Sequence, residues 1–149
     1  MKSNHRIFLD TSVIFSAVLS EMGGARKLFR LGEAGLIQLV VGPNVLRECE
    51  EVVRRKVPAS LPTLAYLLEL GLLEMRPQPL DDFIEQAQAI VAYQPDAYVL
   101  AEAMGAEPDW FVTHDKEHFL KIHQDARLTF QVGTLGDLIQ HLADEFTQT

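Results

Sequence analysis

The chain has 149 residues, of which 48% are hydrophobic and 23% charged, a composition typical of a globular domain that buries a sizeable core. Thirteen Lys and Arg against 21 Asp and Glu give a net charge of -8, which argues against a protein that grips nucleic acid by charge alone. The apolar run near the N-terminus is too short for a signal peptide or a membrane span. Cys49 is the only cysteine, which excludes an intramolecular disulfide and a cysteine zinc cluster. We therefore expect one domain over residues 1–149, in the cytoplasm and without a membrane.

The first predicted element is a strand that ends in a carboxylate. Ile7, Phe8 and Leu9 form a continuous apolar run, as expected of a strand buried on both faces of a parallel sheet, and Asp10 follows directly. In open α/β sheets ligands bind outside the carboxyl ends of the strands. Asp10 is therefore a candidate site residue, although an acid at this place can also serve only as the cap of the next helix.

Strand and helix patterns alternate along the rest of the chain. Apolar runs bounded by Gly, Pro or polar residues predict further strands, and 3.6-residue periodicity predicts the helices between them. The predicted strands are 36–41, 72–75 at an edge, 110–113 and 130–132; the predicted helices are 13–31 with a break near 23–24, 45–56, 63–70, 80–92, one opening at 95–96 and 134–146.

This alternation predicts a three-layer α/β/α fold with a mostly parallel, doubly wound sheet and right-handed crossovers. Five strands in the order 3-2-1-4-5 are the natural arrangement. The first and fourth strands are then neighbours, so Asp10 and Asp115 leave adjacent strands at the same edge of the sheet. Asp96 starts the helix before the fourth strand, either as its N-cap or as a third acid at that edge, whereas Asp109 precedes the strand and belongs at the opposite end.

The helix predicted over 45–56 offers one further acid. Val45, Cys49 and Val53 mark the arc of this helix that faces the core, and Glu48 and Glu50 lie on opposite borders of that arc. Helix spacing does not choose between these two glutamates. Either can also be an ordinary boundary carboxylate, for example with Arg54 as the i,i+4 partner of Glu50.

Several carboxylates at one sheet edge repel one another unless they are protonated or share a cation. An all-oxygen set with few protein ligands suits Mg²⁺ or Mn²⁺ better than zinc. Such ions favour phosphodiester hydrolysis, because they activate water and neutralise phosphate charge. His114, His118 and His123 are expected to be loop or surface residues, with His114 the best candidate for a substrate contact.

The chain resembles the PIN domains, in particular the VapC-type toxin nucleases of prokaryotic toxin–antitoxin systems. The matching stretches are FLDTSVIFSAVLS with GGARKLFRL, then LVVGPNVLRECEEVVRR, then PDAYVLAEAMGAEPDWFVTHDKEHFL, and together they span residues 8–120, about three quarters of the chain. The succession of these stretches along the chain identifies the family more specifically than any single stretch does. The resemblance implies a magnesium-dependent ribonuclease, often a homodimer and often silenced by an antitoxin protein.

By the same resemblance, four acids would be catalytic metal ligands, with Ser12 as the hydroxyl companion of the first where many relatives carry Asn. Glu48 is preferred to Glu50 on this ground alone. The four ligands implied are Asp10, Glu48, Asp96 and Asp115.

The candidate RNA contacts are His114, Lys116, Arg26 and Arg47, although clustered Lys and Arg are often only solvated helix faces. Two other functions compete with a ribonuclease. A haloacid-dehalogenase-like phosphatase also uses an Asp after its first strand, but it requires a second acid two residues later. This chain has Ser12 at that position, which argues against a phosphatase. The other alternative is a catalytically silent PIN-like module that binds RNA or a protein partner without cutting.

Overall fold

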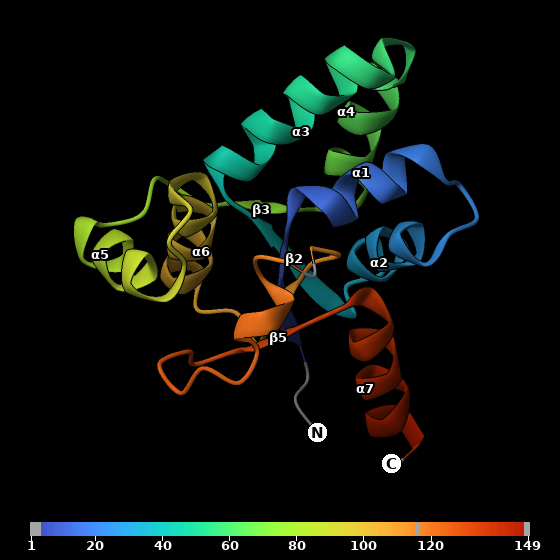
Figure 1. The fold of residues 1–149 in the computed structure, drawn as a ribbon. Helices are drawn as coiled ribbons and strands as arrows, with labels where there is room; N and C mark the ends of the chain where they lie inside the picture. The colour runs from blue at the N-terminus through green and yellow to red at the C-terminus, as the bar shows by residue number, and fades with distance from the viewer. Residues whose placement is uncertain (1–3, 116, 148–149) are drawn as a thin grey trace.

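The computed structural model describes residues 4–115 and 117–147. At its centre lies a five-stranded parallel sheet in the order β3-β2-β1-β4-β5, which confirms the predicted fold class (Figure 1). The strands are β1 (His5–Leu9), β2 (Ile37–Val41), β3 (Glu74–Met75), β4 (Trp110–Val112) and β5 (Gln131–Gly133).

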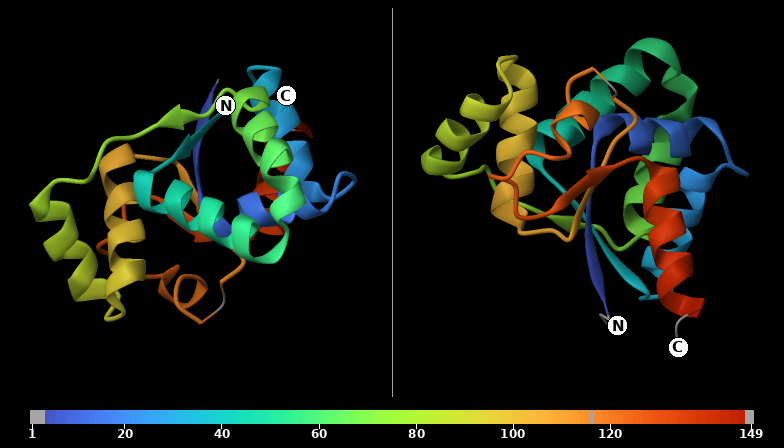
Figure 2. Two further views of the ribbon diagram at one scale, coloured as in Figure 1. Left: turned by 90° about the horizontal axis from the view of Figure 1, so that it is seen from above. Right: turned by 60° about the horizontal axis from the view of Figure 1, so that its bottom comes forward.

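The helices lie in two groups on either side of this sheet. They are α1 (Thr11–Leu19), α2 (Gly24–Glu33), α3 (Pro43–Lys56), α4 (Leu61–Leu70), α5 (Asp81–Ile90), α6 (Gln94–Ala106) and α7 (Leu135–Thr147), with short 3₁₀ turns η1 (Pro58–Ser60) and η2 (Leu120–Ile122). The pair α5 and α6 covers one side, and α1, α2, α4 and α7 lie on the other, while α3 contacts both α1 and α6 (Figures 1 and 2).

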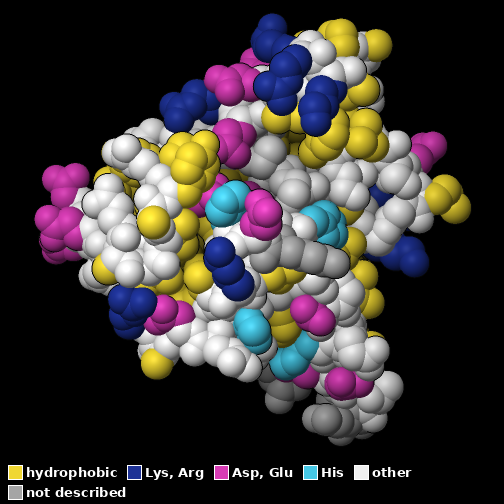
Figure 3. Space-filling view, in the orientation of Figure 1, with side chains coloured by type: hydrophobic (Ala, Val, Ile, Leu, Met, Phe, Trp, Pro, Cys, Tyr) yellow, Lys and Arg dark blue, Asp and Glu magenta, His cyan; other side chains and the backbone are white. Residues whose placement is uncertain are grey.

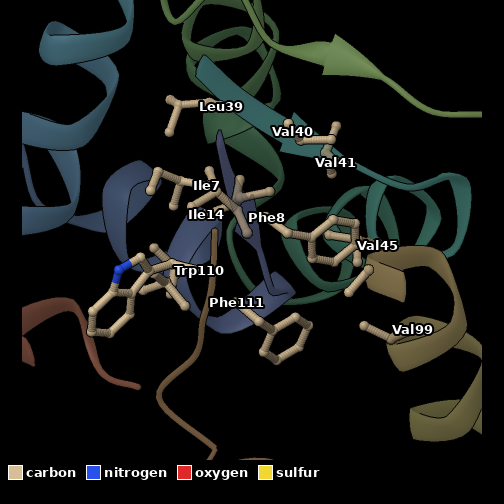
Figure 4. Close-up of a cluster of buried hydrophobic side chains, with 14 of the residues drawn as sticks. Ile7, Phe8, Ile14, Leu39, Val40, Val41, Val45, Val99, Trp110 and Phe111 are labelled. Atoms are coloured by element: carbon tan, nitrogen blue, oxygen red, sulfur yellow. The ribbon is translucent and has the colours of Figure 1, made fainter. Parts of the chain in front are cut away.

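The central strand β1 explains why the sheet forms at this place in the sequence. Ile7, Phe8 and Leu9 are completely buried, as a strand with neighbours on both edges and helices on both faces requires. Phe8 stacks on Phe111 of β4 with ring centroids 5.5 Å apart, and side chains from β2 and the helices complete the core (Figure 4). The core therefore holds β1 and β4 side by side, and this fixes the positions of the residues that follow them.

Most predicted elements are found with shifts of one or two residues at their ends. A capping pair closes the start of α7, where the Thr134 amide donates to Asp137 and the Asp137 amide donates to the Thr134 hydroxyl. One of the two roles that the sequence left open for Asp96 is excluded, and this matters for the site. Asp96 is not the N-cap of α6, because that helix begins at Gln94 with Tyr93 as its N-cap residue.

None of the helices described is long and apolar enough to cross a membrane.

Candidate metal centre at the carboxyl end of the sheet

Asp10 follows β1 and is almost completely buried, with 6% of its surface exposed. It occupies the N-cap position of α1, yet its side chain makes no capping hydrogen bond. Instead, Oδ2 accepts hydrogen bonds from the hydroxyls of Ser12 at 3.0 Å and Thr113 at 2.8 Å. The structure thus favours Asp10 as a site residue over Asp10 as a helix cap. Its carboxylate is held by one hydroxyl from α1 and one from the residue that follows β4.

Asp115 lies just beyond β4, in a short turn that its own carboxylate organises. Its Oδ1 accepts hydrogen bonds from the amides of Glu117 at 3.1 Å and His118 at 3.0 Å, and its amide donates to the Thr113 hydroxyl. The ring nitrogen Nδ1 of His118 lies 3.0 Å from Oδ2 of Asp115. Because Thr113 contacts both Asp10 and Asp115, it ties the two acids to neighbouring strand ends.

Asp96 lies in the first turn of α6 and points into the same region. Its Oδ2 is buried and accepts no hydrogen bond among the residues described, although Nδ1 of His118 lies 3.3 Å away. A buried carboxylate oxygen without a hydrogen-bond donor is costly and calls for a cation or a proton. Asp96 therefore brings an unsatisfied negative group to the edge of the sheet.

The structure separates the two glutamates that helix spacing left undecided. Glu48 is partly buried, and its Oε2 accepts a hydrogen bond of 2.9 Å from the Thr11 hydroxyl, next to Asp10. Glu50 is exposed and pairs with Arg54 at 2.6 Å, one turn along α3. Glu48 is thus placed beside the other acids, and Glu50 is not.

The four acids line one pocket of about 270 Å³, together with Ser12 and apolar side chains of α1 and α3. Burial is the main reason that the pKa values of Asp10 and Glu48 are raised and that the pKa of Asp96 is raised to about 6, and the neighbouring carboxylates add to each rise. Burial also acts on Asp115, but the hydrogen bonds from His118 outweigh it and lower the pKa of that carboxyl. The pocket therefore concentrates negative charge in a partly desolvated place.

The donor set in this pocket fits a hard divalent cation. Carboxylate oxygens are the ligands that Mg²⁺ and Mn²⁺ prefer, and a bound cation would offset both the burial of these charges and their mutual repulsion. Ligand atoms of Asp96, Asp115 and His118 also lie within 4.8 Å of one another, so an imidazole can join the set. All the predicted ligands, Asp10, Glu48, Asp96 and Asp115, are brought together here.

The predicted RNA contacts are distributed unevenly. His114 is exposed at the rim, and its amide donates to the Ser12 hydroxyl. Arg47 is exposed on α3 and, with Glu48, lines an adjoining pocket of about 370 Å³. Arg26 cannot serve as predicted, because its guanidinium is buried and donates to the Ala17 carbonyl. Lys116 lies outside the described residues.

Two residues near the site were not predicted from the sequence. His118 lies in a loop with 40% of its side chain exposed, as expected, but its contacts with two of the acids and its stacking on Tyr93, with centroids 5.7 Å apart, were not predicted. Glu102 of α6 is 2% exposed, and both its carboxylate oxygens accept from the Asn44 amide at the start of α3. Gly42 is required there, since a Cβ would lie only 1.8 Å from the Glu102 carboxylate. The His-to-Asp spacing of three residues was the one available signal for His118.

Comparison with known proteins agrees with this architecture. Residues 6–117 match the model of a PIN domain family, so the chain belongs to the PIN domain family. A search of curated proteins found no match.

Solved structures with the same fold include components of toxin–antitoxin complexes. One is VapBC2 from Rickettsia felis bound to a promoter DNA fragment, with 14% identity, a TM-score of 0.64, and coverage of 87% of this chain and 98% of that one. DNA-bound VapBC from Salmonella typhimurium has 13% identity, a TM-score of 0.63, and coverage of 88% and 98%. VapC20 from Mycobacterium tuberculosis, a toxin that cleaves the sarcin–ricin loop, has 15% identity, a TM-score of 0.55, and coverage of 74% and 91%.

Proposed function

We propose that this protein is a metal-dependent ribonuclease and acts as the toxin of a toxin–antitoxin pair. The observation that carries the proposal is the convergence of Asp10, Glu48, Asp96 and Asp115 on one pocket at the carboxyl end of a PIN-domain sheet. The Mycobacterium neighbour, which is named for cleaving an RNA loop, supports RNA as the substrate class.

Each residue of the site has a definite task in this proposal. Asp10, Asp96, Asp115 and Glu48 would hold Mg²⁺ or Mn²⁺, which when bound activates water and neutralises charge on the scissile phosphate. Ser12 and Thr113 orient the Asp10 carboxylate through their hydroxyls, and the amides of residues 117 and 118 orient Asp115. His114 and Arg47, both exposed at the rim, would contact the RNA backbone.

The similarity to toxin–antitoxin complexes also suggests which proteins bind this chain. Two of the neighbours are VapBC complexes bound to DNA, which supports an antitoxin as a partner of this chain. We further propose that the chain forms a homodimer and acts in the cytoplasm. Co-expression with the protein encoded by the neighbouring reading frame, followed by measurement of the molar mass with and without it, tests both assemblies.

Cleavage of a mixed RNA panel distinguishes the ribonuclease from the silent binding module. The purified protein should cut RNA with Mg²⁺ or Mn²⁺ and stop when EDTA is added, whereas a phosphatase would release inorganic phosphate from small esters. The exposed Glu50, whose carboxylate pairs with Arg54, provides a matched control as Glu50→Gln. RNA binding without cleavage in any divalent metal would select the binding module, and cleavage that survives EDTA would exclude this site.

A further inference from the structure

A second group of metal-binding side chains lies at the amino end of the sheet, far from the four acids. His5 opens β1, while His141 and Glu145 are one turn apart on α7. Residues four apart on a helix share one face, so this pair faces the strand together. Because β1 rises by roughly 3.3 Å per residue, His5 and Asp10 lie about 16 Å apart along the strand, and the two groups are separate.

The three side chains already meet around one point. The Glu145 carboxylate bridges the two imidazoles, with Oε2 at 2.6 Å from His5 Nε2 and Oε1 at 3.2 Å from His141 Nε2. One ligand atom from each residue lies within 4.8 Å of the other two. In a tetrahedral zinc site neighbouring ligand atoms are about 3.3 Å apart, given bonds of roughly 2.0 to 2.1 Å. Small side-chain movements would therefore bring all three atoms into a coordination sphere.

His5 is the buried member of this group. Its side chain is only 9% exposed, and its Nδ1 is buried without a hydrogen-bond partner among the described residues. Buried polar atoms are almost always satisfied, and an exception points to an ion or water.

The surroundings leave room for a further ligand. His5 and His141 line a surface pocket of about 440 Å³, which Asp109, Trp110 and residues 128–131 complete. Figure 3 shows histidine and acidic side chains next to one another on this lower part of the molecule, beside α7. A metal held by the three side chains would thus keep a coordination position open to solvent, and water or a small anion could occupy it.

We propose that His5, His141 and Glu145 form a binding site for a divalent transition metal of the zinc class. Two imidazoles and one carboxylate are a recognised zinc donor set, whereas Mg²⁺ prefers oxygen ligands and would select the other end of the sheet. The ion would clamp α7 onto β1, so it would stabilise the attachment of the C-terminal helix. The proposal does not depend on the ribonuclease assignment, because its ligands, metal and location are all different.

Trp110 provides a local reporter for this site. It is the only tryptophan of the chain, and its ring centroid lies 5.4 Å from that of His141. Ni²⁺ bound at the three side chains should quench its fluorescence, with saturation at one equivalent in the metal-stripped protein. Zn²⁺ at a hundredfold excess over its Kd should raise the Tm by about 5 to 10 °C, as binding to the folded state alone requires for a chain of this size.

The variants separate this site from adventitious binding. His141→Ala should raise the apparent Kd for Ni²⁺, measured from the quenching, at least about a hundredfold. Glu145→Gln, which keeps the shape of the side chain, should also raise this Kd strongly. His123→Ala removes an exposed histidine elsewhere, and His118→Ala removes the imidazole of the other cluster, so both should quench like the parent.

Quenching that persists in His141→Ala, or that disappears in His118→Ala instead, would overturn the proposal, as would a parent protein without saturable quenching. Circular dichroism establishes that each variant is folded. Anomalous scattering from zinc-soaked crystals of the parent gives an answer that needs no variant. A peak between His5 and His141 is expected, and peaks confined to the neighbourhood of Asp96 and Asp115 would overturn the assignment.

Discussion

The acidic side chains around the start of β1 differ from those at the carboxyl end of the sheet, where three of the four acids in the pocket have raised pKa values. Near the start of β1, Arg6 forms two hydrogen bonds with Glu74, which belongs to the edge strand β3, and His5 and His141 contact Glu145. These contacts lower the pKa values of both glutamates. At the carboxyl end, burial and neighbouring charges raise the pKa values of Asp10, Glu48 and Asp96. A raised pKa means that holding the ionised carboxylate costs stability, so Asp10, Glu48 and Asp96 are the acids whose cost a bound cation would offset.

The largest effect expected from this contrast is on catalysis. Asp10→Asn or Asp115→Asn should lower RNA cleavage at least about a hundredfold, because even groups that only orient metal ligands contribute roughly 10- to 100-fold. The matched control is Glu74→Gln, which removes a carboxylate that is paired with Arg6 and does not line the pocket, and it should retain the parent rate. Initial rates at saturating Mg²⁺ measure all three. Parent-like cleavage by both Asp variants would place the active site elsewhere.

A second test compares the two neighbouring glutamates on α3. Glu48→Gln should lower the rate by roughly 10- to 100-fold, because it weakens the metal site, whereas Glu50→Gln removes only an exposed pair with Arg54 and should change little. Cleavage rates across a Mg²⁺ titration reveal whether the loss comes from weaker metal binding. Equal losses in the two variants would contradict the assignment of Glu48 to the site.

The fold could be predicted largely from local patterns. The run Ile7-Phe8-Leu9 identified the central strand, and the regular alternation of elements gave the order of the strands, because parallel sheets allow few connections. The two-residue strand β3 was predicted two residues too long at its start, since a pair of residues carries almost no periodicity.

The site was predictable only where strand ends determine position. Asp10 and Asp115 follow strands, so their meeting follows from topology, whereas the choice of Glu48 needed the family resemblance. The RNA-binding role expected for Arg26 was wrong, because its guanidinium is buried and donates to the Ala17 carbonyl. The sequence alone does not show that this carbonyl lies within reach. His118 was missed for a similar reason: its contact with Asp96 joins two segments through tertiary structure.

A third prediction concerns the effect of metal on stability. A ligand that binds only the folded state stabilises it by about 2.7 kcal/mol at a hundredfold excess over Kd, so saturating Mg²⁺ should raise the free energy of unfolding of the parent by that order. Asp10→Asn should lose most of this increment, yet without metal it should be at least as stable as the parent, because one repelling charge is gone. Denaturant curves with EDTA and with Mg²⁺ measure both. A variant that keeps the full Mg²⁺ response would show that Asp10 is not a ligand.

The smallest effect expected concerns Glu102, a buried acid near the carboxyl end of β2 whose charge is met by amides of α3. Burial, opposed in part by these hydrogen bonds, raises its pKa from 4.5 to about 7. Between these values the folded protein holds a proton that the unfolded chain releases, so this residue makes stability fall as the pH rises from about 4.5 to 7. Glu102→Gln keeps an oxygen for the Asn44 amide but cannot ionise, and this decline should therefore be absent.

Relative to the parent, Glu102→Gln should thus gain roughly 1 to 2 kcal/mol in free energy of unfolding between pH 5 and pH 8. Each unit of the pKa difference between the folded and unfolded states corresponds to about 1.36 kcal/mol, and only part of the full difference is expected. Urea denaturation in EDTA at both pH values measures this gain, because the titrations common to both proteins cancel in the double difference. Glu50→Gln should give a double difference near zero, since that carboxylate is exposed. If Glu102→Gln behaves in the same way, its carboxylate carries no burial cost, and the raised pKa values at this end of the sheet are confined to Asp10, Glu48 and Asp96.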